Sequence, residues 1–166
     1  NWINEGAVLV MDSYSGGIAG INTGSVVDCS CDVDYDATAQ RLFALNGVRC
    51  DYAGGMVGYN SGSIYSDVVR SVATVAKGRN YVGGVVGYNA ADAEITNCEL
   101  QGGYVSGNIF VGGYAGLNMS IYLVDGSSLS ADPNSVVGNY CVGGMIGANI
   151  VAAGNADQIS ATYNTY

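Results

Sequence analysis

One heptad, Gly-Gly-x-x-Gly-x-Asn, occurs five times in this chain of 166 residues and constrains its fold more than any other feature. The leading glycines of successive copies are 38, 29, 29 and 31 residues apart, so the basic period is 29 with one insertion of about nine. Self-similarity at such a period is the signature of a repeat architecture. The fixed positions are Gly16, Gly17, Gly20 and Asn22; Gly54, Gly55, Gly58 and Asn60; Gly83, Gly84, Gly87 and Asn89; Gly112, Gly113, Gly116 and Asn118; and Gly143, Gly144, Gly147 and Asn149.

The position two residues before each glycine pair also repeats its chemistry, since it is aromatic in four copies: Tyr14, Tyr52, Tyr81 and Phe110, with Cys141 in the fifth. In a solenoid, equivalent residues of successive coils lie about 4.8 Å apart and must tolerate one another. The pattern therefore predicts an aromatic stack and an asparagine ladder. We predict an all-β fold, a parallel β-helix or β-solenoid of about five coils of ~29 residues, forming one domain over residues 1–166. Hairpins of a β-sandwich are the weaker alternative, because a sandwich does not require regularly spaced glycines.

Other segments of each coil have the composition of strands. Residues 94–100 predict one strand after the third heptad, and Val68, Val69, Val72 and Val75 predict another that closes the coil before a turn at 77–80. Gly83 and Gly84 are expected either to adopt positive φ or to let adjacent layers approach closely.

The insertion covers residues 34–50 and has helix-forming composition. Asp36 is a candidate cap for a short helix that ends near Asn46 and packs Leu42 and Phe43 on the flank of the solenoid. A structural lid is favoured over a binding loop.

Alternating acids at Asp32, Asp34 and Asp36 resemble a calcium loop. However, Ala37 replaces the glycine of such a loop and Phe43 its final glutamate, which favours a solvated acidic edge. No metal and no cofactor are expected.

The five cysteines form no CxxC pair. Cys29 and Cys98 occupy equivalent positions two coils apart, beyond the ~7 Å that a disulfide spans, so they are expected to be buried thiols. If any bridge forms, Cys50 would join Cys29 or Cys31.

Composition excludes several function classes. With 14 acidic and 5 basic residues the net charge is −9, which disfavours nucleic acid and anionic membranes, and every apolar run is too short for membrane insertion. The absence of histidine removes the commonest general base. Parallel β-helices include polysaccharide lyases, but the acidic pair Asp92 and Glu94 is more typical of a solvated turn, so no enzyme activity is expected.

The ends suggest a piece of a longer protein, because the chain starts at Asn1 without methionine. Uncapped coils would expose strand edges, so we expect the chain either to self-associate end to end or to rely on flanking sequence.

The sequence GGVVGYN at 83–89, together with SGSI at 61–64 and ITNC at 95–98, resembles the GLUG motif of secreted and surface-attached bacterial proteins. The fourth copy departs from it, since Asn118-Met119-Ser120 replaces an Asn-x-Gly turn. The resemblance implies a β-helical stalk or ligand-presenting surface without catalytic residues, in an adhesin-like protein that is secreted or located at the bacterial cell surface.

A binding module is the alternative function. Both faces of the heptad strand look apolar, with Val82, Val86 and Tyr88 on one side and Tyr81 and Val85 on the other. The second face is then covered by the chain itself or by a partner, and burial of the aromatic residues is favoured over ligand stacking. Tyr14, Tyr52, Tyr81 and Phe110 are the candidate binding residues, for a glycan or protein of a host or neighbouring cell. Such a module could be ancillary to a protease or a glycan-degrading enzyme.

Overall fold

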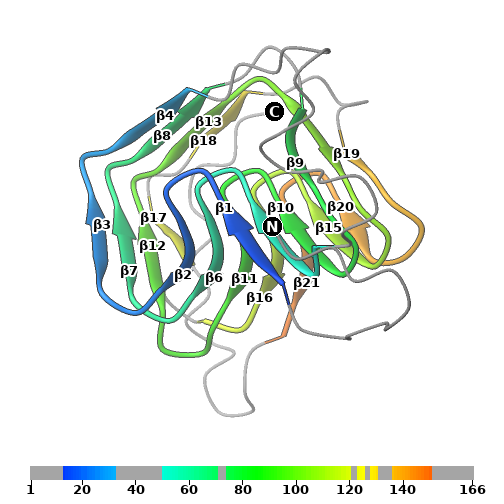
Figure 1. Cartoon of the computed structure of the whole chain (residues 1–166), viewed down its shortest axis with the longest axis horizontal. Helices are drawn as coiled ribbons and strands as arrows, with labels where there is room; N and C mark the ends of the chain where they lie inside the picture. The colour runs from blue at the N-terminus through cyan, green and yellow to red at the C-terminus, as the bar shows by residue number, and fades with distance from the viewer. Residues whose placement is uncertain are drawn as a thin grey trace, which may run out of the picture.

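The computed structural model describes residues 13–32, 50–70, 74–120, 123–125, 128–130 and 136–150, and in these ranges every regular element is a β-strand. Every strand pair is parallel and joins successive copies of the repeat, so the described chain winds as a stack of coils (Figure 1). Two of the sheets have five strands, one from each heptad. The predicted all-β solenoid of about five coils is confirmed, and the alternative of antiparallel hairpins is wrong.

Five sheets form the walls, and each coil adds strands to them in a fixed order. Sheet 1 contains β1 (Tyr14–Gly16), β5 (Tyr52–Gly54), β10 (Tyr81–Gly83), β15 (Phe110–Gly112) and β20 (Val142–Gly143). Sheet 2 contains β2 (Ala19–Asn22), β6 (Val57–Asn60), β11 (Val86–Asn89), β16 (Ala115–Asn118) and β21 (Ile146–Asn149). Sheet 3 contains β3 (Ser25–Val27), β7 (Ser63–Tyr65), β12 (Glu94–Thr96) and β17 (Leu123–Asp125). Sheet 4 contains β4 (Ser30–Asp32), β8 (Val68–Arg70), β13 (Glu99–Gln101) and β18 (Ser128–Ser130). Sheet 5 contains β9 (Thr74–Lys77), β14 (Tyr104–Ser106) and β19 (Val136–Val137).

The register of the sheets reproduces the alignment of the heptads. Tyr81 pairs with Tyr52 on one side and with Phe110 on the other. In sheet 2, Asn89 pairs with Asn60 and Asn118. Identical positions of the repeat are therefore spatial neighbours.

The core is a column of inward-facing side chains shared by the sheets. In the third coil, Val82, Val86, Ile95, Leu100 and Val105 come from five different strands, and all are at most 1% exposed. Each coil thus covers the apolar interior of the next, which is the packing that a repeat with one buried face requires.

The chain turns a corner between sheets 3 and 4 at residues with positive φ. Asn97 has φ of 54°, so the single strand predicted over residues 94–100 is in fact two strands, β12 and β13. Ser66 and Asp28 occupy the same corner in the preceding coils, with φ of 56° and 52°. Asn and Asp tolerate this region better than other non-glycine residues.

The second predicted strand is also divided, into β8 and β9, with Val75 of β9 fully buried. Apart from Cys50, the insertion at 34–50 and its expected helix lie outside the described residues, as do both chain ends. In the described part, no helix has the length and hydrophobicity that crossing a membrane requires.

The paired glycines of the heptad were expected either to adopt positive φ or to let the backbone approach closely, and their contacts support close approach. A Cβ on Gly83 would collide first with the carbonyl oxygen of Val86 in the same turn and would also lie 2.7 Å from the carbonyl oxygen of Tyr114 in the next coil. A Cβ on Gly84 would collide with the carbonyl oxygen of Gly113 and the side chain of Leu100. Positive φ is recorded among the described glycines at Gly102 and Gly103 instead. Close approach of the backbone, within the turn for the first glycine and between layers for the second, is the reason for glycine in the pair, rather than positive φ.

Candidate functional site

The aromatic positions of the repeat form a continuous stack on sheet 1, which we call the first ladder: Tyr14, Tyr52, Tyr81 and Phe110. Successive ring centroids are 4.6, 4.8 and 5.3 Å apart, with interplanar angles of 16°, 20° and 8°. The strands set this spacing. Because they are parallel and in register, equivalent side chains of neighbouring strands lie as far apart as the strands themselves, about 4.8 Å. The predicted aromatic stack is confirmed.

A second ladder, Tyr59 and Tyr88, lies beside the first on sheet 2. The two rings are 5.1 Å apart with an interplanar angle of 15°. Tyr88 meets Tyr81 edge-on at 5.4 Å and 87°, and Tyr59 meets Tyr52 at 6.0 Å and 80°. Edge-to-face contacts of this kind suit the aromatic quadrupole. The ladders therefore form one aromatic surface in which each supports the other.

The position of Tyr88 corrects the sequence analysis, which placed it on the face of Val82 and opposite Tyr81. In the structure Val82, Val85 and Val86 all face the core, whereas Tyr81 and Tyr88 share the outer surface. The bend at the glycine pair resets the alternation between β10 and β11. Recurrence of tyrosine before asparagine in two heptads is the signal that could have identified the second ladder.

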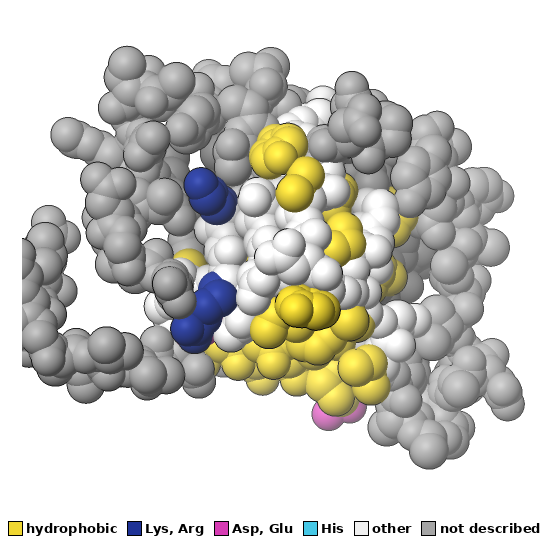
Figure 2. Space-filling view, turned by 90° about the vertical axis from the view of Figure 1, so that its right-hand side faces the viewer, with side chains coloured by type: hydrophobic (Ala, Val, Ile, Leu, Met, Phe, Trp, Pro, Cys, Tyr) yellow, Lys and Arg dark blue, Asp and Glu magenta, His cyan; other side chains and the backbone are white. Residues whose placement is uncertain are grey.

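The two ladders are only partly buried, so burial and ligand contact both remain as explanations of the aromatic positions. Tyr14 is 37% exposed, and the other rings of both ladders are half-buried. Figure 2 views the right-hand side of Figure 1 and shows its largest group of hydrophobic side chains in the lower middle of the view, with Lys or Arg side chains to the left and smaller hydrophobic groups above. An apolar patch on a protein with 14 acidic and 5 basic residues is a candidate interaction surface.

Stacking limits how the ladders can contact a ligand. Tyr52 is flanked by Tyr14 and Tyr81, and Tyr81 by Tyr52 and Phe110, so both faces of these two rings already lie against other rings. A sugar ring that binds by stacking needs a free aromatic face. The inner rungs offer their edges instead, which favours a flat apolar partner over a stacked sugar.

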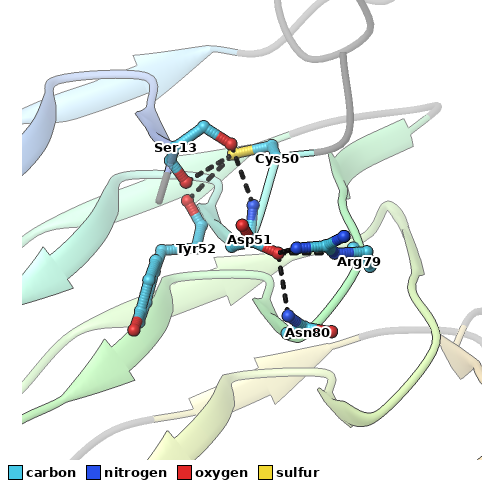
Figure 3. Close-up of polar contacts among 6 residues, drawn as sticks. All are labelled: Ser13, Cys50, Asp51, Tyr52, Arg79 and Asn80. Atoms are coloured by element: carbon cyan, nitrogen blue, oxygen red, sulfur yellow. Dashed lines mark hydrogen bonds and ion pairs between the residues drawn. The ribbon is translucent and has the colours of Figure 1, made fainter. Parts of the chain in front are cut away.

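A buried ion pair fixes the chain just before the first ladder (Figure 3). Asp51 is 2% exposed, and its Oδ1 accepts hydrogen bonds from Arg79 Nε at 2.6 Å and Asn80 Nδ2 at 2.8 Å. The backbone N–H of Asp51 donates to Ser13 of the preceding coil. Because these residues directly precede Tyr14, Tyr52 and Tyr81, the cluster orders three rungs of the ladder together.

The cysteines are all unbridged, including Cys50 and its two candidate partners. Cys98 is 1% exposed, and burial raises the pKa of its thiol to about 11, so the protonated form prevails at neutral pH. Cys29 is half-buried and Cys141 is exposed. The expectation of a buried thiol is confirmed for Cys98, whereas Cys29 is only partly buried and packs against the core. Cys50 also belongs to the core, where it acts as a small apolar residue.

A buried acid, Asp67, was not anticipated. It occupies the position of Cys29 and Cys98 in the intervening coil and has no exposed surface. Its Oδ1 accepts a hydrogen bond of 2.5 Å from the backbone N–H of Cys29, whereas Oδ2 has no partner. Burial is the main cause that raises the pKa of this carboxyl, and the charge of Asp28 adds to it.

The remaining candidates do not form a site in the described residues. Asp32 ends β4, while Asp34 and Asp36 lie outside the described ranges. Asp92, in the turn before β12, and Glu94, the first residue of β12, are both exposed. In the described ranges, no three metal-ligating side chains come together.

Comparison with known families finds a match in the third coil. The GLUG motif matches residues 78–109, a segment that runs from the turn before β10 almost to β15 and so covers the whole third coil. No curated protein and no solved structure matches the chain. The matched segment contains the heptad whose glycines and asparagine are described above, and the chain therefore contains a GLUG motif at residues 78–109.

Proposed function

We propose that this chain is a non-catalytic structural segment of a secreted or cell-surface bacterial protein, where it acts as a stalk or display scaffold. The GLUG motif at residues 78–109 supports this location, because the motif is typical of secreted and surface proteins.

One observation carries the proposal: the fixed positions of the heptad have structural explanations. The paired glycines allow backbone approach between layers, and Asn60, Asn89 and Asn118 hydrogen-bond to one another inside the core. A catalytic repeat would keep polar groups on the surface, whereas this repeat keeps them where coils meet. The absence of histidine from the sequence agrees with this interpretation.

The second candidate function is a binding module, which the partial exposure of the ladders favours. Such a module would use the first ladder together with Tyr59 and Tyr88 to adhere to a protein or glycan of a host or neighbouring cell. The stacked arrangement favours a protein with a flat apolar surface. Attached to a protease or a glycan-degrading enzyme, the same surface would hold that enzyme near its substrate.

Surface labelling of the bacterium that produces this chain tests the scaffold. Antibodies raised against the folded chain should label intact cells, and deletion of the repeat unit 83–111 should leave the protein folded and displayed. Labelling of lysed cells alone would refute the location, and hydrolysis of a glycan or peptide by the chain would refute its non-catalytic nature.

Binding assays test the second candidate. Glycan arrays and host-protein panels should be compared for the wild type, Tyr81→Ala and the control Tyr104→Ala, which alters a tyrosine of sheet 5 that is 39% exposed. Binding that Tyr81→Ala alone abolishes, with folding retained, would establish the binding module. Equal binding by all three proteins would exclude the ladders as the surface used.

A further inference from the structure

The ladders hold tyrosines of adjacent coils in face-to-face contact. Tyr52 lies 4.6 Å from Tyr14 and 4.8 Å from Tyr81, measured between ring centroids, and Tyr59 lies 5.1 Å from Tyr88. All three pairs are stacked within 20° of parallel. Because these rings are partly exposed, small oxidants and surface-acting enzymes can reach their edges.

From this geometry we propose that the two ladders are a modification site, at which a peroxidase using hydrogen peroxide joins tyrosines of adjacent coils as dityrosine. The bond would link Tyr52 to Tyr14 or Tyr81, or Tyr59 to Tyr88. Phe110 ends the first ladder and has no phenol to oxidise, so cross-linking along this ladder is confined to the first three coils.

The reaction balances with one peroxide per cross-link. Each phenol loses one electron and one proton and becomes a phenoxyl radical, whose unpaired electron is shared with the two ring carbons next to the oxygen. Two radicals form a carbon–carbon bond between these ring carbons, and each displaced hydrogen then moves to the oxygen of its own ring. The two hydrogen atoms lost overall reduce one hydrogen peroxide to two water molecules.

Proximity decides which tyrosines couple. In-register strands hold Tyr59 and Tyr88 at the separation of neighbouring strands, so two radicals can meet by side-chain rotation alone. Tyr65 and Tyr140 are more exposed, at 47% and 66%, and Tyr65 belongs to a different sheet. Exposure predicts reaction at Tyr140, whereas stacking predicts reaction in the ladders.

A neighbouring sulfur competes for the oxidising equivalents. The hydroxyl of Tyr88 donates a hydrogen bond of 2.7 Å to Sδ of Met119. Thioethers oxidise to the sulfoxide, so a Met119 sulfoxide is the expected side product. Cross-links across coil interfaces would restrict the unfolded chain, as disulfides do, and would stiffen the scaffold.

The test treats the full chain with horseradish peroxidase and hydrogen peroxide after alkylation of accessible thiols, because the exposed Cys141 would reduce the radicals. Dityrosine fluorescence and mass spectrometry of the linked peptides identify the product. We expect a monomeric product linked within a ladder, with a yield that does not depend on protein concentration.

Tyr→Phe variants show whether contact between rings or exposure to solvent determines which tyrosines become cross-linked. Tyr52→Phe/Tyr59→Phe/Tyr88→Phe keeps the rings and removes every contacting pair of tyrosines in the ladders, including Tyr81 and Tyr88, which meet edge-on at 5.4 Å. The intramolecular yield should therefore fall by about tenfold or more. The control Tyr65→Phe/Tyr140→Phe should retain the wild-type yield. Cross-links that map to Tyr65 or Tyr140 in dimers, an unchanged yield in the ladder variant, or a sulfoxide at Met119 without dityrosine would each overturn the proposal.

Discussion

The side-chain amide of Asn60 donates a hydrogen bond of 2.9 Å to the side-chain oxygen of Asn89, and both side chains are fully buried. Equivalent hydrogen bonds from Nδ2 to Oδ1 join Asn22 to Asn60, Asn89 to Asn118 and Asn118 to Asn149, at 2.8, 3.0 and 2.7 Å. A chain of amides thus runs along the solenoid inside an otherwise apolar column. Cooperative bonding in a low-dielectric interior makes such a network costly to interrupt.

Replacement of Asn89 by alanine should lower the free energy of unfolding by about 2 kcal/mol or more, because it removes two buried side-chain hydrogen bonds and leaves a cavity. Urea denaturation measures the effect. Asn139→Ala is the matched control, since Asn139 donates a similar bond of 2.8 Å to Asn108 at an exposed site. Equal losses in the two variants would show that the interior ladder has no special role.

Gly84→Ala should destabilise the protein by about 3 kcal/mol or more, because the added Cβ collides with the backbone of the next coil, which cannot move independently. Gly24→Ala is the control, since a Cβ at Gly24 meets nothing within 4 Å and should change stability by less than about 0.5 kcal/mol. Thermal denaturation compares the two. A melting temperature of Gly84→Ala close to that of the wild type would refute the close-approach explanation.

Asp67→Asn should remove part of the pH dependence of stability. Burial raises the pKa of Asp67 in the folded state above its unfolded value of about 3.9, so the folded state favours the protonated acid. Asp67 therefore contributes most to the stability of the wild-type folded state below the unfolded pKa, and this contribution is lost as the pH rises through the folded pKa. The variant should therefore gain stability relative to the wild type as the pH rises from about 4 toward neutrality.

Urea denaturation across this pH range provides the measurement, with Asp92→Asn, at an exposed turn residue, as the control. A constant difference between Asp67→Asn and the wild type at all pH values would show that Asp67 does not titrate in this interval.

Asp51→Ala should cost about 2 kcal/mol, because it removes the partner of Arg79 and Asn80 from a site where the carboxylate is 2% exposed. The partial exposure of Arg79 keeps the loss below that of a fully buried pair. Because the pair is largely shielded from solvent, the loss measured by urea denaturation should persist in about 1 M salt. A loss that salt abolishes would identify an ordinary surface ion pair.

The register of the solenoid could be predicted because the heptad fixes both the spacing and the identity of neighbours. Alignment of Tyr52, Tyr81 and Phe110 in the sequence is the same alignment that the strands adopt. In the fourth copy, Ser120 replaces the glycine of the Asn-x-Gly turn, but the turn keeps its hydrogen bond. The backbone N–H of Ser120 donates to Asn118 Oδ1, as that of Gly62 does to Asn60 Oδ1.

Side-chain direction could not be predicted where the chain bends. A strict alternation of faces assumes a continuous strand, and the glycine pair between β10 and β11 breaks it, which is why Tyr88 was assigned to the wrong face. The same limitation hid the corner at Asn97, where positive φ divides the predicted strand. Asp67 was missed because aspartate is usually exposed, and only its alignment with Cys29 and Cys98 indicates an inward position.

The asparagine ladder also bears on how such a protein changes length during evolution. The bond from Asn60 to Asn89 and the bond from Asn89 to Asn118 both span 29 residues and have nearly the same length, so the upper surface of one coil is chemically equivalent to the upper surface of the next. A duplicated coil would meet matching amides, glycines and rings on both sides. Gene segments of one repeat can therefore be gained or lost without the need to evolve a new interface.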